Sequence, residues 1–209
     1  MKTIETNGIS YLERLGGDWY FGTDYTLGDL YEAEEVFRSG GTVKPNRVIF
    51  VRFPEGKLTE PVRLGENQYF GRPFWLDGSI YLLLADFGRG SLQILNCGRE
   101  AEAAAAIAEL PLSEVRDCYN LLLSGSPLML TRQGGENRFE IVWPRKLSFP
   151  IGNTESFLYR EGERLFFSRW FEDPDYREEL VVRAPDGSIL EIAQGSVFSA
   201  PDGESWLLK

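Results

Sequence analysis

The sequence contains no histidine, and this absence removes several kinds of site at once. Histidine is the usual acid or base at neutral pH, the usual partner of nucleophilic serine or cysteine, and a common zinc ligand. Only two cysteines are present, Cys97 and Cys118, which is too few for a disulfide framework or a structural zinc site. We therefore expect no metal, no cofactor and no histidine-based catalytic site.

Long apolar runs and an excess of basic residues are missing as well. No window approaches the run of about 18 apolar residues that spans a membrane, and the first ten residues, MKTIETNGIS, lack the pattern of a signal peptide. With 22 Lys and Arg against 32 Asp and Glu, the formal net charge is -10. A surface of this sign repels phosphate backbones and anionic lipids. These features predict a soluble cytoplasmic protein that binds neither nucleic acid nor membranes.

What the sequence does contain is a recurring glycine turn. An extended segment precedes each turn and an apolar or aromatic run follows it, as in LDGSIYLLL, at Gly17, Gly78, Gly125, Gly162 and Gly203. Glycine supplies the positive φ that a tight hairpin needs. Hydrophobic residues make up 43% of the 209-residue chain, which is enough to build a core. Each copy is therefore predicted to be a β-hairpin within a single domain, residues 1–209.

A second hairpin follows each of the first four copies, near Gly56, Gly98, Pro144 and Gly187. Each repeat thus offers four short strands, A to D, in roughly 40 to 50 residues, which is typical of a propeller blade. The predicted fold is all-β, a β-propeller of four-stranded antiparallel blades. The last copy, around Gly203, has strands A and B alone, and MKTIET can supply a third strand to it, so five blades are favoured over four. The alternative is an antiparallel β-sandwich.

The repeated four-strand unit resembles β-propeller proteins over nearly the whole chain. No Trp-Asp pair ends the third strands, no Gly-Gly pair recurs as in kelch repeats, and no Asp-box spacing is found. The resemblance therefore implies a fold and a usual place for a site, and it implies no activity.

Two segments depart from the repeat. Residues 22–46 lengthen the B–C connection of the first blade, and Leu30, Ala33 and Phe37 with the Gly40-Gly41 stop predict a helix at about 28–39. The alanine-rich stretch REAEAAAAIAEL predicts a helical turn or two near 99–106, followed by a short edge strand.

The B–C and D–A connections of a propeller emerge on one face, where binding residues concentrate. Arginine suits carboxylate or phosphate oxygens, and flat rings suit sugars. Arginines and aromatic residues near the B–C connections, together with Asp24 at the strand end equivalent to Arg132 and Arg169, are the predicted ligand-binding residues: Tyr20, Asp24, Tyr25, Arg89, Arg132, Arg169, Trp170 and Tyr176. Alternatively, the arginines simply pair with the acidic insertion, which carries Asp24, Asp29, Glu32, Glu34 and Glu35.

These patterns favour a binding or interaction module whose ligand is a small carbohydrate, a small anion or a protein partner; no oligomeric state is indicated. The alternative is a small glycan-active enzyme that uses Glu13, Asp117 and Glu155 from three blades. A third possibility is a subunit that docks through Trp170 and Phe171. Cys97 and Cys118 are expected at opposite ends of their strands, too far apart for a disulfide.

Overall fold

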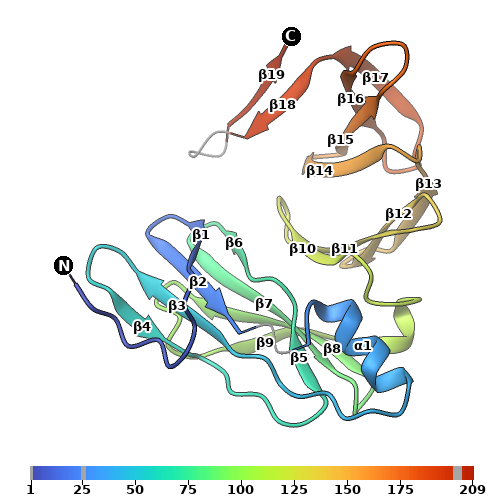
Figure 1. Cartoon of the computed structure of the whole chain (residues 1–209). Coiled ribbons are helices and arrows are strands. Elements are labelled where there is room, and N and C mark those ends of the chain that lie inside the picture. The colour runs from blue at the N-terminus through green and yellow to red at the C-terminus, as the bar shows by residue number, and fades with distance from the viewer. Residues whose placement is uncertain (1, 25–26, 200–203) are drawn as a thin grey trace. The chain divides into compact units, whose positions relative to one another are not determined.

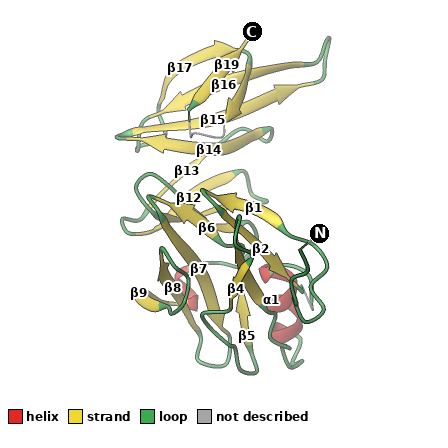
Figure 2. Cartoon of the chain, turned by 90° about the vertical axis from the view of Figure 1, so that its left-hand side faces the viewer, coloured by secondary structure: helices red, strands yellow, loops and turns green. Residues whose placement is uncertain are grey.

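The computed structural model describes residues 2–24, 27–199 and 204–209. Within them strands dominate, accompanied by one α-helix and one short 3₁₀ turn (Figure 2). The chain divides into two compact units, Met1–Leu123 and Ser124–Lys209. No helix in the described part of the chain is long and apolar enough to cross a membrane.

The first unit contains two antiparallel sheets (Figure 1). The first sheet has the order β1-β2-β3-β4 and consists of β1 (Glu13–Gly16), β2 (Trp19–Thr23), β3 (Val48–Arg52) and β4 (Lys57–Thr59). The second has the order β5-β7-β8-β9, with β6 also paired to β7. Its strands are β5 (Gln68–Phe70), β6 (Phe74–Leu76), β7 (Ser79–Asp86), β8 (Ser91–Gly98) and β9 (Ala105–Pro111). The 3₁₀ turn η1 (Leu112–Glu114) follows.

Two further four-stranded sheets and a hairpin follow along the chain. The third sheet is β10 (Leu121–Ser124), β11 (Met129–Gly134), β12 (Arg138–Trp143) and β13 (Leu147–Pro150). The fourth is β14 (Glu155–Glu161), β15 (Arg164–Phe171), β16 (Arg177–Arg183) and β17 (Ile189–Gln194). The hairpin is β18 (Ser196–Ser199) with β19 (Ser205–Leu208). In both four-stranded sheets the spatial order follows the chain order.

The prediction of an all-β propeller of four-stranded antiparallel blades is confirmed, with four blades. A fifth blade completed by the N-terminal segment is not formed, because β18 and β19 make a two-stranded sheet among the described residues. Residues 2–6 form no strand. The Lys2 ammonium instead donates to the carbonyls of Pro54 and Glu55, at 2.8 and 2.7 Å, in the β3–β4 turn.

The hairpin glycines behave as the sequence predicts where a tight turn is made. Gly17, Gly78 and Gly162 have φ of 53°, 80° and 55°, a region that L side chains avoid. Gly125 lies in the β10–β11 connection without a positive φ. Gly203 lies outside the described residues.

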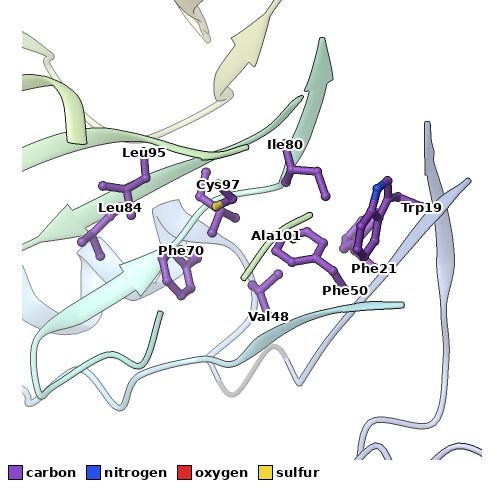
Figure 3. Close-up of a cluster of buried hydrophobic side chains, with 11 residues drawn as sticks. Trp19, Phe21, Val48, Phe50, Phe70, Ile80, Leu84, Leu95, Cys97 and Ala101 are labelled. Carbon is purple, nitrogen blue, oxygen red and sulfur yellow. The ribbon is translucent and has the colours of Figure 1, made fainter. Parts of the chain in front are cut away.

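The core of each unit lies between two adjacent blades. In the first unit, Trp19 and Phe21 of β2 face Ile80 of β7 and Cys97 of β8 across the interface, and Figure 3 shows these side chains pointing toward one another. In the second unit, Phe139 of β12 meets Phe167 of β15 edge to face, with ring centroids 5.2 Å apart. Blade-to-blade packing of this kind is how a propeller buries apolar surface. Trp206 on β19 lies outside these cores and is 52% exposed.

Helix α1 (Leu30–Arg38) occupies the segment expected to be helical. Asp29 caps it, since its side chain accepts from the Glu32 N–H while the Glu32 side chain accepts from the Asp29 N–H. The face with Leu30 and Ala33 is buried.

The helical turns expected at 99–106 are absent, and that prediction is wrong. Residues 99–104 form a turn and loop in which Ala101 has φ 49°, and β9 begins at Ala105 and pairs with β8. Hydrogen bonding to a neighbouring strand outweighs the helix propensity of alanine, which is only a few tenths of a kcal/mol per residue relative to other good helix formers.

Candidate binding site

The insertion between β2 and β3 is closed at its base by Asp24 and Arg47. The Asp24 carboxylate accepts from the Arg47 backbone N–H at 2.8 Å, and the Asp24 N–H donates weakly to the Arg47 carbonyl at 3.4 Å. Both ends of a 22-residue excursion are thereby held together, which fixes the loop entry and exit.

Three polar side chains join the insertion to β5 and the segment before it. The amide of Asn46 donates to the Phe70 carbonyl (3.0 Å) and accepts from its N–H (2.8 Å), so it pairs like a neighbouring strand. Asn67 accepts from the Val43 N–H at 3.0 Å, and the Tyr69 hydroxyl donates to the Gly28 carbonyl at 2.7 Å. These bonds hold the described part of the insertion, residues 27–46, against β5.

A cavity of about 430 Å³ opens beside the hydrogen-bonded pair of Asp24 and Arg47, and we call it the Asp24–Arg63 cavity. It is lined by Asn7, Asp24, Pro45, Asn46, Arg47, Glu60, Val62, Arg63 and Leu64. Val62 and Leu64 pack against the core of the unit, so one wall of the cavity is aliphatic.

The polar wall of the Asp24–Arg63 cavity keeps unused hydrogen-bonding capacity. Arg47 forms a two-point pair with Glu60 (3.2 and 3.0 Å) and donates to the Asn7 carbonyl at 3.1 Å. Three of its five guanidinium N–H groups are thus occupied by described residues, and two remain. The hydrogen bonds that Arg47 donates to Glu60 raise the pKa of Arg47, so the guanidinium stays charged.

Two further groups of the Asp24–Arg63 cavity lack a complete set of partners within the described chain. Asp24 uses one carboxylate oxygen on Arg47, which leaves the other to accept. Arg63 is exposed and makes no hydrogen bond or ion pair to another described residue. The wall thus offers donors and acceptors side by side.

A second, smaller cavity of about 200 Å³ lies at the N-terminal end of α1. It is lined by Asp29, Leu30, Phe70, Gly71, Arg72, Cys118, Asn120, Leu121 and Leu122. Arg72 is engaged there with the Glu13 carboxylate at 2.6 Å and lies over the Phe21 ring. Its charge is therefore already neutralised by a neighbour.

The four predicted site residues of the first unit do not converge on one point. Asp24 lines the Asp24–Arg63 cavity, and Tyr20 is half-buried on β2 opposite Arg14 and Val51. Arg89 extends into solvent from the β7–β8 turn, with 78% of its side chain exposed. Tyr25 lies outside the described residues.

The four predicted residues of the second unit lie on β11, on β15 and just before β16. Arg132 is fully buried and pairs with Glu136 and Glu140 at 3.0 and 3.1 Å. Arg169 pairs with Glu179 at 2.6 Å. Exposed Trp170 lies opposite Glu178 in the β15–β16 ladder, and the exposed Tyr176 hydroxyl donates to the same carboxylate.

The carboxylates that pair with Arg132 and Arg169 come from their own blades and not from the acidic insertion. The carboxylates considered for catalysis are also engaged. Glu13 pairs with Arg72, Glu155 is buried and pairs with Arg183, and Asp117 accepts from the Tyr119 N–H. Both cysteines are free thiols, so no disulfide contradicts the strand assignment.

Sequence reasoning missed Arg47, Glu60 and Arg63. The predicted residues lie near the end of the second strand of each blade, whereas Arg47 follows the insertion and Glu60 and Arg63 follow the fourth strand, β4. The sequence could have indicated these residues, because the chain leaves the fourth strand of a blade on the same face of a propeller as the one where the insertion begins.

No protein-family model matches the chain, and no curated protein matches it. Among solved structures, a nidogen/laminin complex aligns with 91% of this chain and 66% of its own, at 13% identity and a TM-score of 0.46. An exo-β-1,3-galactanase from Phanerochaete chrysosporium, with β-1,3-galactotriose, aligns with 92% of this chain and 50% of its own, at 9% identity and a TM-score of 0.41. This chain therefore spans half to two thirds of those chains, and a likeness this low assigns no function.

Proposed function

We propose that the chain is a binding module and that its Asp24–Arg63 cavity takes a neutral polyhydroxylated ligand, a mono- or disaccharide. The observation that carries the proposal is the lining of that cavity, where free guanidinium donors stand beside free carboxylate acceptors over an aliphatic wall. Propeller folds commonly serve as binding modules, with the ligand on a loop face.

A hydroxyl group matches this lining because it both donates and accepts. It can accept from Arg47 or Arg63 and donate to Asp24 or Glu60, all of which line the cavity. A small anion fits less well, since it would face two carboxylates in a protein of net charge -10. The C–H face of a sugar ring can lie on Val62 and Leu64.

The size of the cavity supports the same class of ligand. Small-molecule pockets range from roughly 300 to 1,000 Å³, and 430 Å³ lies near the lower end of that range. One or two sugar rings fit such a volume. One wall is formed by the end of the insertion, which is already hydrogen-bonded to β5, so binding should cost little conformational entropy there.

Titration calorimetry with glucose, galactose, mannose, N-acetylglucosamine, maltose and lactose tests the proposal, with glucuronate and phosphate as anionic probes. At least one neutral sugar is expected to bind, and the Asp24→Asn and Arg63→Ala variants are each expected to weaken it about five- to tenfold. Arg89→Ala, an exposed arginine on the β7–β8 turn, is the matched control and should bind as the parent does.

Absence of binding by every neutral sugar would overturn the proposal. So would unchanged affinity in both cavity variants, which would place the ligand elsewhere. Tighter binding of glucuronate or phosphate than of any neutral sugar would instead make the cavity an anion site.

A further inference from the structure

The outer strand of the fourth blade, β17, differs from the outer strands of the other three. An unpaired strand edge invites another strand, and proteins commonly protect it with short length, lysine or proline. Of the other described outer strands, β4 has three residues and begins at Lys57, β13 has four and ends at Pro150, and β9 ends at Pro111. Each therefore carries at least one of these protections.

Strand β17 is six residues long, with the sequence ILEIAQ, and contains no proline, lysine or arginine. It is the last strand in its sheet order, so no described strand pairs with its outer edge. Ile189, Leu190 and Ile192 are 46%, 54% and 49% exposed. An apolar, exposed edge of this length is a site where a further strand can be added.

The register identifies which backbone groups face outward. Beyond an irregularity near Leu190, Glu191, Ile192, Ala193 and Gln194 pair regularly with β16. The Gly195 N–H donates inward to the Glu178 carbonyl at 2.9 Å. Because the inward and outward directions alternate in an antiparallel pair, the N–H and C=O groups of Ile192 and Gln194 point to the open edge.

A groove of about 710 Å³ lies at the C-terminal end of β17, beside the start of β16. Five consecutive residues line it, Ile192–Ser196, together with Tyr176, Arg177, Glu178 and Lys209. It can therefore receive a side chain from the end of a segment laid along β17.

The charges around β17 are mainly negative. Glu191 is exposed on the strand and pairs with Arg164 at 2.6 Å, and Glu178 lines the groove together with Lys209. The preceding loop carries exposed Glu172, Asp173 and Asp175. The neighbouring Arg177 is engaged, since its guanidinium donates to the Asp173 carbonyl and lies 4.1 Å from the Phe171 ring centroid. A second copy of this chain would bring another Glu191 and another net charge of -10, so it is disfavoured.

We propose that β17 binds an extended segment of a partner protein by strand addition, and that this segment alternates apolar and cationic side chains. The alternation follows from the two faces of the strand. Ile192 shares a face with buried Val181, and Glu191 shares the other face with Val182. Apolar side chains of the added strand extend the first face, and on the second face lysine or arginine meets the Glu191 oxygen that the Arg164 pair leaves unused.

Fluorescence anisotropy with the labelled peptide acetyl-KVKVKVK-amide tests the proposal on the full chain. The peptide is expected to bind at least about tenfold more tightly than acetyl-EVEVEVE-amide, and acetyl-KVKPKVK-amide, which cannot form a continuous strand, should lose most of the affinity. Sugar binding by the Asp24–Arg63 cavity is independent of this result.

The matched variants are Gln194→Pro and Gln194→Thr. Proline removes an outward N–H without breaking the β16–β17 ladder and should reduce peptide affinity about tenfold or more, whereas threonine keeps the N–H and should leave it unchanged. If the proline variant fails to fold, Glu191→Lys is the deciding variant. It should weaken binding of acetyl-KVKVKVK-amide and strengthen binding of acetyl-EVEVEVE-amide.

Three results would overturn the proposal: equal binding by Gln194→Pro, equal binding of the proline-containing peptide, or no preference between the two charge types. Sedimentation velocity supplies a further check. A dimer of the parent chain that Gln194→Pro abolishes would assign the edge to a second copy instead of a partner segment.

Discussion

Replacement of Glu155 by glutamine should destabilise the second unit strongly, because this carboxylate closes a buried ionic network. Arg183 donates to both of its oxygens, at 3.0 and 2.8 Å, and the Gly152 N–H donates to one of them. The side chains of Glu155 and Arg183 are 1% and 10% exposed. The Arg183 guanidinium also lies 6.0 Å from the ring centroids of Phe149 and Phe167, at the edge of the core.

Removal of one partner from a buried ion pair costs about 3 to 5 kcal/mol, chiefly because the remaining charge is left without compensation. Glutamine is isosteric and still accepts one hydrogen bond, so we expect a loss near the lower end, about 3 kcal/mol. The matched control is Glu161→Gln, which changes an exposed carboxylate on the same strand and should shift the free energy of unfolding by less than about 0.5 kcal/mol.

The destabilisation should also depend on pH. Burial alone raises the pKa of Glu155, but hydrogen bonds from Arg183 and Gly152 and the charge of Arg183 overcome it, so the pKa lies below its ordinary 4.5. The unfolded chain then takes up a proton at a higher pH than the folded chain does. The stabilisation is therefore complete above the ordinary value and is lost as pH falls through the folded pKa.

Urea unfolding followed by tryptophan fluorescence at several pH values from 4 to 8 measures both effects. The free-energy difference between the parent and Glu155→Gln should be constant from neutral pH down to about 5 and shrink below the ordinary pKa. A difference under about 1 kcal/mol at pH 7, or one that grows on acidification, would show that the carboxylate does not carry this stability.

Two further predictions concern buried groups. Burial raises the pKa of Cys97 to about 12, and burial together with the nearby Glu34 carboxylate raises the pKa of Cys118. Iodoacetamide at pH 8 should therefore label neither thiol until the chain is unfolded, which mass spectrometry can measure. Rapid labelling of the native chain would contradict the burial of the two thiols. Asn46→Ala leaves the buried backbone of Phe70 without two partners, at a cost of about 1 to 3 kcal/mol. Trypsin should therefore cleave the insertion after Arg38 faster than in the parent, and equal rates would show that the loop is held by other contacts.

The parts of the fold that the sequence predicts are those with local causes. Gly78 is needed because its φ is 80°, and the β6–β7 hairpin forms around it whatever lies further along the chain. Helix α1 begins at a capping box made by residues three apart, Asp29 and Glu32, and one face carries its apolar residues. Both signals lie within a few residues of each other, so the sequence reveals them.

The parts that sequence reasoning missed are decided by partners far along the chain. The alanine-rich segment forms β9 because β8 offers hydrogen bonds, which no local propensity encodes. The N-terminal segment lies against the β3–β4 turn through Lys2. Its six residues are compatible with a strand, and only the contact some 50 residues away shows where they lie.

The arginines show why a candidate site is harder to predict than a fold. Position at the end of a strand is visible in sequence, but it does not separate a binding arginine from a structural one. Arg132 and Arg169 have that position, and both pair with carboxylates of their own blade, so their charge is already matched. Arg63 has no such position, yet its charge is unmatched in the described chain and it lines a cavity with a free carboxylate oxygen. Since a ligand can gain only from donors and acceptors that the fold has not already used, the unpaired group is the better candidate even though the paired ones look more regular in the sequence.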